Sequence, residues 1–155
     1  MAAHSHTLNI GIRTGPEGGV VGVDIDVKDR GLERWQELVA ERGDWHTATV
    51  RSARGGFHKY ACFDGPAATL AARTKVGGGG AGIDIRNANG YLVAPPSKLP
   101  EAGAYEWVDG MGPGELSDMP AWVFAEVSPK APPPAAKAKG AASQSGALLR
   151  KAQRN

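Results

Sequence analysis

Apolar and polar positions alternate along several segments of the chain, as is typical of β-strands that bury one face. The segments are 19–27 (GVVGVDIDV), 56–63 (GFHKYACF), and 82–86 (GIDIR) continuing through 90–94 (GYLVA). A short β-prone piece, 47–51 (TATVR), is expected to pair with 56–63 through a turn at 52–56. Lys59 falls on the face opposite His58, where an apolar residue would be expected; two interpretations are open, a side chain that snorkels at an edge of the sheet and a position under relaxed constraint.

Helical spacing of apolar residues appears between positions 29 and 43, where charged residues fill the other positions and Gly43 is a stop signal. The apolar residues are Leu32, Trp35, Leu38 and Val39. Shorter helices are predicted over 66–75 and over 120–127, where Pro120 stands in the first turn. Strands and helices mix without a regular strand-helix rhythm, so the pattern favours an α+β fold over a doubly wound one.

The composition changes sharply after Val127. Residues 1–127 carry 12 Lys and Arg against 16 Asp and Glu, whereas residues 128–155 carry 6 against 0. We therefore expect a disordered N-terminus over 1–8, one domain over 9–127, and a flexible Pro/Ala/Lys-rich tail over 128–155. The tail could contact DNA phosphates in a salt-sensitive way, although a solvated linker is the simpler interpretation.

Membrane and disulfide classes are disfavoured by the sequence. No run approaches the roughly 18 apolar residues of a membrane span, and the N-terminus lacks the regions of a signal peptide. The single cysteine, Cys62, excludes an internal disulfide and a zinc site built from several cysteines. These features predict a cytoplasmic protein without membrane association.

Asp24 and Asp26 interrupt the first apolar segment two positions apart, so they are predicted to share one face of a strand. The residues that alternate with them, Val23, Ile25 and Val27, are predicted to point into the core. Neighbouring carboxylates repel each other and need a cation or a solvated surface. Taken alone, the pair fits a strand with one wet face as well as it fits a metal site.

A second acidic strand favours the metal site over a strand with one solvent-exposed face. Asp84 and Arg86 share one face of 82–86, and His58 follows a glycine pair on a third strand. Mg²⁺ prefers carboxylate oxygens completed by water and phosphate, and two such ions can clamp the oxygens of a phosphoryl transfer. Histidine and arginine donate hydrogen bonds to phosphate oxygens. The combination predicts a site for divalent metal and a nucleoside triphosphate.

Two segments are similar to parts of phosphate-binding motifs, but the rest of each motif is missing from the sequence. Residues 77–82 (GGGGAG) satisfy G-x-G-x-x-G, but a strand follows where a dinucleotide fold requires a helix. Residues 20–26 (VVGVDID) are similar to the acidic strand of a P-loop ATPase, but the chain contains no G-x-x-x-x-G-K-[ST].

A set of segments occurs in a fixed order between about Asn9 and about Val127. They are NIGIRTG (9–15), VVGVDIDV (20–27), RGGFHKY (54–60), GIDIRNANGYLVAPPS (82–97), YEW (105–107) and MPAW (119–122). Together they resemble the bifunctional DNA primase/polymerase (Prim-Pol) domain of the archaeo-eukaryotic primase superfamily, and the combination is far more specific than any single element. The resemblance implies an RRM-like, primase-type mixed β-sheet with flanking helices.

The resemblance also implies a template-dependent nucleotidyltransferase of DNA replication, in which a 3′-hydroxyl attacks the α-phosphate of a nucleoside triphosphate. Asp24, Asp26 and Asp84 match the family residues that bind catalytic Mg²⁺ or Mn²⁺. His58 matches the histidine that contacts the triphosphate, and Arg86 is implied as a phosphate or metal-site partner. Basic residues that flank this site are candidate template contacts: Arg51, Arg54, Arg73 and Lys75.

The implied partners are a DNA template and nucleoside triphosphates. Family members usually carry further residues before the segment that matches 9–15, so the resemblance implies an N-terminally shortened domain. A helicase, or a chain that supplies the N-terminal part, is then a further partner. Two alternatives stay open. One is a noncatalytic, truncated primase-like module that binds nucleotides or nucleic acid, and the other is a different DxD metal-dependent transferase, against which His58 and Asp84 count.

Overall fold

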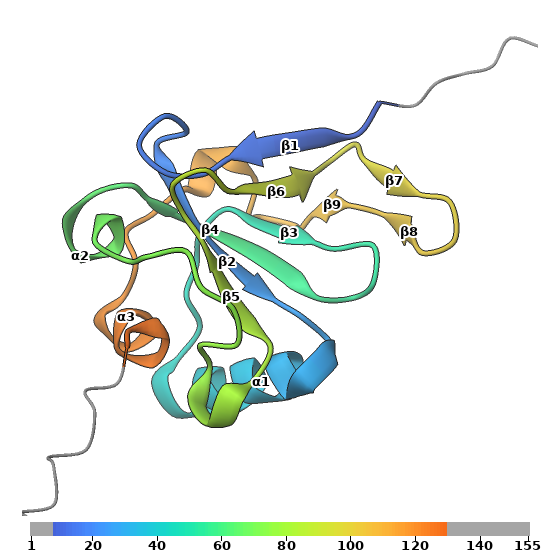
Figure 1. Ribbon diagram of the computed structural model, residues 1–155. Helices are drawn as coiled ribbons and strands as arrows, with labels where there is room; N and C mark the ends of the chain where they lie inside the picture. The colour runs from blue at the N-terminus through green and yellow to red at the C-terminus, as the bar shows by residue number, and fades with distance from the viewer. Residues whose placement is uncertain (1–7, 130–155) are drawn as a thin grey trace, which may run out of the picture.

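The computed structural model describes residues 8–129 (Figure 1), so the predictions for most of 1–8 and for nearly all of the tail lie outside the described residues. The strands are β1 (Ile10–Arg13), β2 (Val20–Ile25), β3 (Thr49–Arg51), β4 (Phe57–Cys62), β5 (Ile83–Arg86), β6 (Tyr91–Ala94), β7 (Lys98–Leu99), β8 (Gly103–Ala104) and β9 (Glu106–Trp107). The helices are α1 (Gly31–Arg42), α2 (Gly65–Ala68) and α3 (Ala121–Val127), with 3₁₀ turns η1 (Lys28–Arg30), η2 (Gly78–Gly80) and η3 (Pro113–Glu115).

The centre of the molecule is a five-stranded antiparallel sheet with the strand order β5-β2-β4-β3-β9. Strands β1 and β6 form a separate antiparallel ribbon, and β7 pairs with β8. Antiparallel sheets combined with a few helices confirm the α+β fold class. No helix in the described part of the chain is long and apolar enough to cross a membrane.

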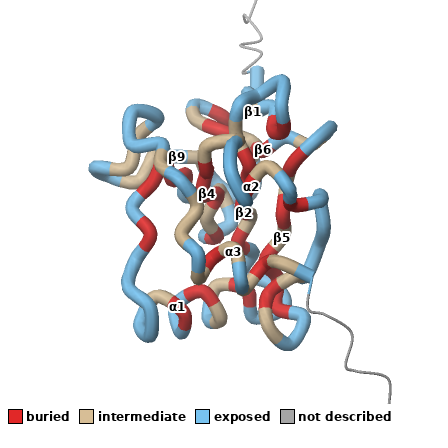
Figure 2. Tube along the Cα trace, turned by 90° about the vertical axis from the view of Figure 1, so that its left-hand side faces the viewer, coloured by how far each residue is buried: buried red, intermediate tan, exposed pale blue. Residues whose placement is uncertain are grey.

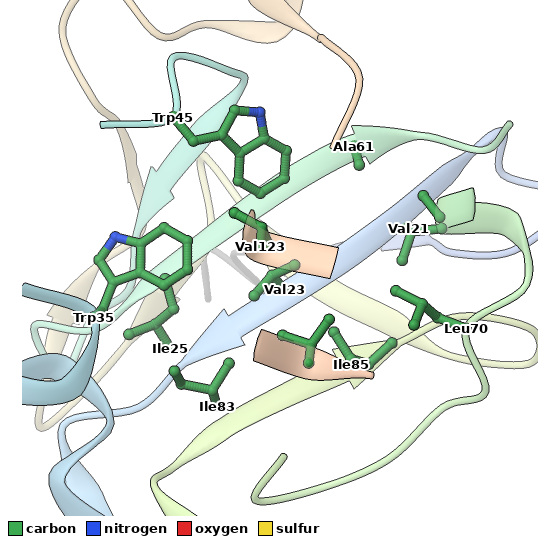
Figure 3. Close-up of a cluster of buried hydrophobic side chains, with 12 residues drawn as sticks. Val21, Val23, Ile25, Trp35, Trp45, Ala61, Leu70, Ile83, Ile85 and Val123 are labelled. Carbon is green, nitrogen blue, oxygen red and sulfur yellow. The ribbon is translucent and has the colours of Figure 1, made fainter. Parts of the chain in front are cut away.

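One face of the central sheet forms the main hydrophobic core. The strand residues are Val21, Val23, Ile25, Ile83 and Ile85, all at most 1% exposed. Figure 3 shows Trp35 of α1 and Val123 of α3 packed over these side chains. Burying each such side chain stabilises the fold by roughly 1.5–3 kcal/mol. The alternation in β2 and β5 therefore fixes which face is left for polar residues.

The ribbon β1–β6 packs on part of the opposite face. Leu92 of β6 joins a smaller cluster with Val50 and Tyr60 of the central sheet. A Cβ on Gly22 would lie 2.5 Å from Leu92 Cδ1, so glycine at this position gives the Leu92 side chain room to pack on the sheet. In Figure 2 the buried residues follow β2, β4 and β5, whereas β1 is mostly exposed. The ribbon therefore covers the sheet around Gly22 and Tyr60.

Several predicted elements are confirmed. Residues 29–43 contain α1, which ends at Gly43 with φ +86°, and 120–127 contain α3, which begins after Pro120. Strand β3 pairs with β4 as expected for 47–51, and the turn between them is closed by the Ser52 N–H donating to Gly56 O at 2.9 Å.

Two predicted boundaries are wrong. The strand predicted over 19–27 ends at Ile25, because η1 turns the chain toward α1; Val27 is 42% exposed and does not enter the core. The helix predicted over 66–75 is limited to α2, because Arg73 instead forms an antiparallel bridge with Ile85 and extends the sheet edge.

The structure contradicts the first interpretation of Lys59, a side chain that snorkels at an edge of the sheet. Strand β4 lies inside the sheet, so the side chain has no edge to reach and is 4% exposed. Its Nζ donates hydrogen bonds to Trp45 O at 2.8 Å and to Thr49 Oγ1 at 3.2 Å. Burial lowers the pKa of Lys59, and Asp44, 3.8 Å away, opposes this only in part.

The lowered pKa of Lys59 predicts a specific pH dependence of stability. Between the folded and the unfolded pKa the unfolded chain binds one more proton than the native protein, so the free energy of unfolding rises with pH in a window below 10.5. Lys59→Met should remove this rise, which urea unfolding between about pH 8 and pH 10 would measure. The matched control is Lys98→Met at an exposed position. Equal slopes for wild type and Lys59→Met would contradict the prediction.

Candidate active site

Strand register brings three predicted site residues into one row. Asp24 of β2 lies directly opposite His58 of β4 on one side and Asp84 of β5 on the other. All three project from the face that does not carry the main core, because Val23 and Ile25 point the other way. The side chains are 22%, 8% and 20% exposed, respectively, so the row is only partly open to solvent.

Arg86 joins Asp24 to Asp84. Its Nη2 donates to Asp84 Oδ2 at 2.9 Å and to Asp24 Oδ2 at 3.2 Å. The other oxygens have different partners, because Asp24 Oδ1 faces His58 and Asp84 Oδ1 accepts the Lys75 N–H at 2.9 Å. One oxygen from each carboxylate therefore converges on the same point.

His58 is held in one orientation by the ribbon. Its Nδ1 lies 2.9 Å from the carbonyl oxygen of Val93, and a carbonyl only accepts, so Nδ1 carries the hydrogen. In the neutral ring, Nε2 then presents its lone pair toward Asp24 Oδ1, 3.5 Å away. Two acceptors that face each other leave room for a proton or a ligand donor between them.

Burial dominates the electrostatics of this pair. It raises the pKa of Asp24, although His58 and Arg86 oppose the rise. It also lowers the pKa of His58, although Asp24 opposes this. Each shift disfavours the charged form, so the site holds groups whose charges the protein alone does not fully compensate.

Asp26 lies beyond the end of β2 rather than on its face. It is exposed, its N–H donates to Gly82 O at 2.8 Å, and its Oδ1 accepts the Lys28 N–H at 3.2 Å. Asp26 therefore lies one residue past the end of the strand predicted to carry it. Consistent with this, residues 8–129 contain no group of three or more acidic, histidine or cysteine side chains close enough to hold a metal ion.

Two hollows meet at Asp24 and His58. The smaller, of about 160 Å³, is lined by Asp24, Ile25, Asp26, Lys28, Ser52, Arg54, His58 and Tyr105. The larger, of about 420 Å³, is lined by Asp24, His58, Arg86, Asn89, Gly90, Tyr91, Leu92, Val93 and Tyr105. Asp26 thus faces the same small hollow as Asp24 although it has left the strand. The smaller hollow is rich in charge, and the larger one offers aromatic and backbone groups.

The candidate template contacts fall on two sides of the site. Arg51 ends β3 and Arg54 lies in the following turn, where it lines the smaller hollow. Arg73 and Lys75 lie beside β5. Lys75 also pairs through Nζ with Asp29 at 3.0 Å, so both its backbone and its side chain are engaged.

Tyr105 and Lys28 are site residues that the sequence did not single out. The ring of Tyr105 lies 5.7 Å from that of His58, and Tyr105 lines both hollows. Its only sequence signal is the YEW segment, where it could equally be a core residue. Lys28 could not be identified, because its position depends on the turn after β2.

The comparison with protein families adds one decisive observation. The model of the bifunctional DNA primase/polymerase N-terminal domain matches residues 1–122. The chain belongs to the bifunctional DNA primase/polymerase family. The comparison with curated proteins found no match. The Prim-Pol match includes every residue of the Asp24–His58–Asp84 row.

Proposed function

We propose that this Prim-Pol domain is a template-dependent DNA primase/polymerase that acts in the cytoplasm and transfers a nucleotidyl group from a nucleoside triphosphate to a 3′-hydroxyl. The observation that carries the proposal is the cross-strand row of Asp24, His58 and Asp84 beside two hollows. A carboxylate pair and a histidine on rigid strands suit a reaction in which positioning and electrostatics do most of the catalysis.

The residues fit a divalent cation such as Mg²⁺ or Mn²⁺. Asp24 and Asp84 converge through one oxygen each, and Asp26 faces the same hollow as Asp24. Mg²⁺ typically takes only one or two protein carboxylates and completes its shell with water and substrate phosphates, so a preassembled cage is not required. When bound, such cations supply the charge that lowers the pKa of the attacking hydroxyl and neutralises the departing pyrophosphate.

His58 would hold the substrate's phosphates through Nε2. The hydrogen bond from Nδ1 to Val93 O fixes the ring, and Nε2 is directed toward the hollows. A nearby polyanion raises the pKa of a histidine, so the ring would take up a proton as the triphosphate binds. Nε2–H would then donate to a phosphate oxygen, and Arg54 and Lys28 would add charge from the smaller hollow.

A noncatalytic module that binds nucleotides or nucleic acid is the second candidate. It is favoured by the pairing of Arg86 with both Asp24 and Asp84, which compensates part of the carboxylate charge without a metal. It is also favoured by the position of Asp26 outside the strand. Such a module would bind single-stranded DNA or triphosphates but would not extend a primer.

The deciding experiment is incorporation of labelled dNTP and NTP on primed and unprimed single-stranded DNA with Mg²⁺ or Mn²⁺. We expect product that depends on the template and vanishes in Asp24→Ala/Asp26→Ala. Binding of template without product under either metal, from a protein shown to be folded, would reject the enzyme in favour of the binding module. Addition of a helicase or of a further chain would test whether a partner is required.

A further inference from the structure

The contact between Arg86 and the two carboxylates is unusual in its geometry. Arginine frequently binds carboxylates through two nitrogens of its planar fork. Here both contacts, to Asp24 Oδ2 and to Asp84 Oδ2, use the single nitrogen Nη2. One positively charged nitrogen therefore lies at the point where two carboxylate oxygens converge, as a bridging cation would.

The ion pairs of Arg86 with the two carboxylates are accessible to solvent and are not fixed by a second nitrogen. Its side chain is 36% exposed, the more exposed member of both ion pairs, and it lines the larger hollow. A one-nitrogen contact to a partly exposed guanidinium lacks the geometric fixation of a bidentate pair. Asp24 and Asp84, in contrast, are held by the backbone pairing of β2 with β5 and keep their positions if the arginine leaves.

We infer that Arg86 is an exchangeable stand-in for the catalytic cation: its guanidinium compensates part of the charge of Asp24 and Asp84 in the metal-free protein, and a divalent cation must displace it to bind. This inference rests on the proposed function, because it takes the carboxylates to be the metal site. Arg86 and the cation compete for the same oxygens, so each weakens the binding of the other by the same factor. Arg86 thus sets the cation concentration at which the site fills.

The test is the affinity for Mn²⁺ alone, measured from the electron paramagnetic resonance signal of the free ion with no nucleotide present. Arg86→Gln removes the charge and should bind Mn²⁺ on the order of tenfold more tightly than wild type. Arg54→Gln is the matched control, because Arg54 lines a hollow with Asp24 but forms no ion pair with it in the described residues. It should change the affinity by no more than about twofold. Arg86→Lys keeps the charge and should stay near wild type.

Thermal unfolding gives a second readout that does not depend on activity. Without metal, Arg86→Gln leaves Asp24 and Asp84 in mutual repulsion and should unfold at a lower temperature than wild type. Saturating Mn²⁺ should raise the unfolding temperature of Arg86→Gln more than that of wild type.

The outcomes separate this inference from the proposed function. If wild type binds Mn²⁺ clearly and Arg86→Gln binds it equally or more weakly, the exchange is overturned. The metal site itself would still be supported. An effect of Arg54→Gln as large as that of Arg86→Gln would also overturn it, because only general charge would then matter. Absence of Mn²⁺ binding in both wild type and Arg86→Gln would reject the metal site itself, and the exchange with it.

Discussion

Asp24→Asn should lower primer extension by about two to three orders of magnitude, which is the usual loss when one electrostatic group of an active site is removed. Asp24 is the middle residue of the Asp84–Asp24–His58 row and lines both hollows. An amide has the same shape but cannot neutralise a cation. The measurement is the rate of labelled dNTP incorporation on a primed template, with Asp109→Asn at an exposed position as the control.

The same substitution should leave stability unchanged or increase it. Burial raises the pKa of Asp24, so at neutral pH the charged form is less favourable in the folded protein than in the unfolded chain. A neutral amide removes that cost. The introduced amide could also direct its oxygen to Arg86 and its nitrogen to the Nε2 lone pair of His58, to which an ionised carboxylate donates no hydrogen bond.

Urea unfolding of Asp24→Asn would therefore separate a functional from a structural carboxylate. Loss of activity at undiminished stability is the expected combination, since active sites commonly retain groups that the fold alone would not favour. Extension within about threefold of wild type would contradict the role given to Asp24. A large loss of stability would show that the carboxylate serves the fold.

The faces of the central strands could be predicted because alternation is a local property. Once Val23, Ile25, Ile83 and Ile85 point into the core, Asp24 and Asp84 must share the other face. Alternation does not state which residues lie opposite each other. The alignment of Asp24 with both His58 and Asp84 comes from strand register, which depends on distant parts of the chain.

The errors in prediction have the same origin. Strand β2 stops at Ile25 because the following turn packs against Gly82, a contact across more than fifty positions of sequence. Lys59 is buried because Trp45 O and Thr49 Oγ1 approach from another segment and accept its hydrogen bonds. In both cases a long-range partner overrides a local pattern, and that partner is not visible in the segment itself.

Gly31→Ala should destabilise the protein by about 3 kcal/mol, although the same change in an exposed helix usually stabilises by up to about 1 kcal/mol. Gly31 is buried at the start of α1. A Cβ there would collide with the carbonyl oxygen of Gly82 and lie 2.5 Å from that of Asp26. Both are backbone oxygens, and Gly82 O also accepts the Asp26 N–H at 2.8 Å, which ties the two segments together, so neither oxygen can move aside freely.

The turn before Gly31 explains why the backbone cannot easily take another path from β2 into α1. Asp29 and Arg30 both adopt positive φ, 52° and 57°, a conformation that L side chains rarely take. This turn redirects the chain from β2 into α1, and the Gly82 N–H donates to Asp29 O at 3.0 Å. Glycine at position 31 lets the two segments cross at backbone contact distance, and the crossing places Asp26 at the smaller hollow.

Urea unfolding of Gly31→Ala would measure the cost, with Gly112→Ala as the control, because φ is −72° there and nothing lies within 4 Å of the new Cβ. The control should change the free energy of unfolding by less than about 1 kcal/mol. Gly82→Ala should disturb the same crossing, because a Cβ on Gly82 would collide with the carbonyl oxygen of Lys28. Since one displacement relieves both collisions, the double variant should lose less than the sum of the single losses. Additive losses, or a Gly31→Ala protein as stable as wild type, would mean that the two segments separate easily and do not fix Asp26.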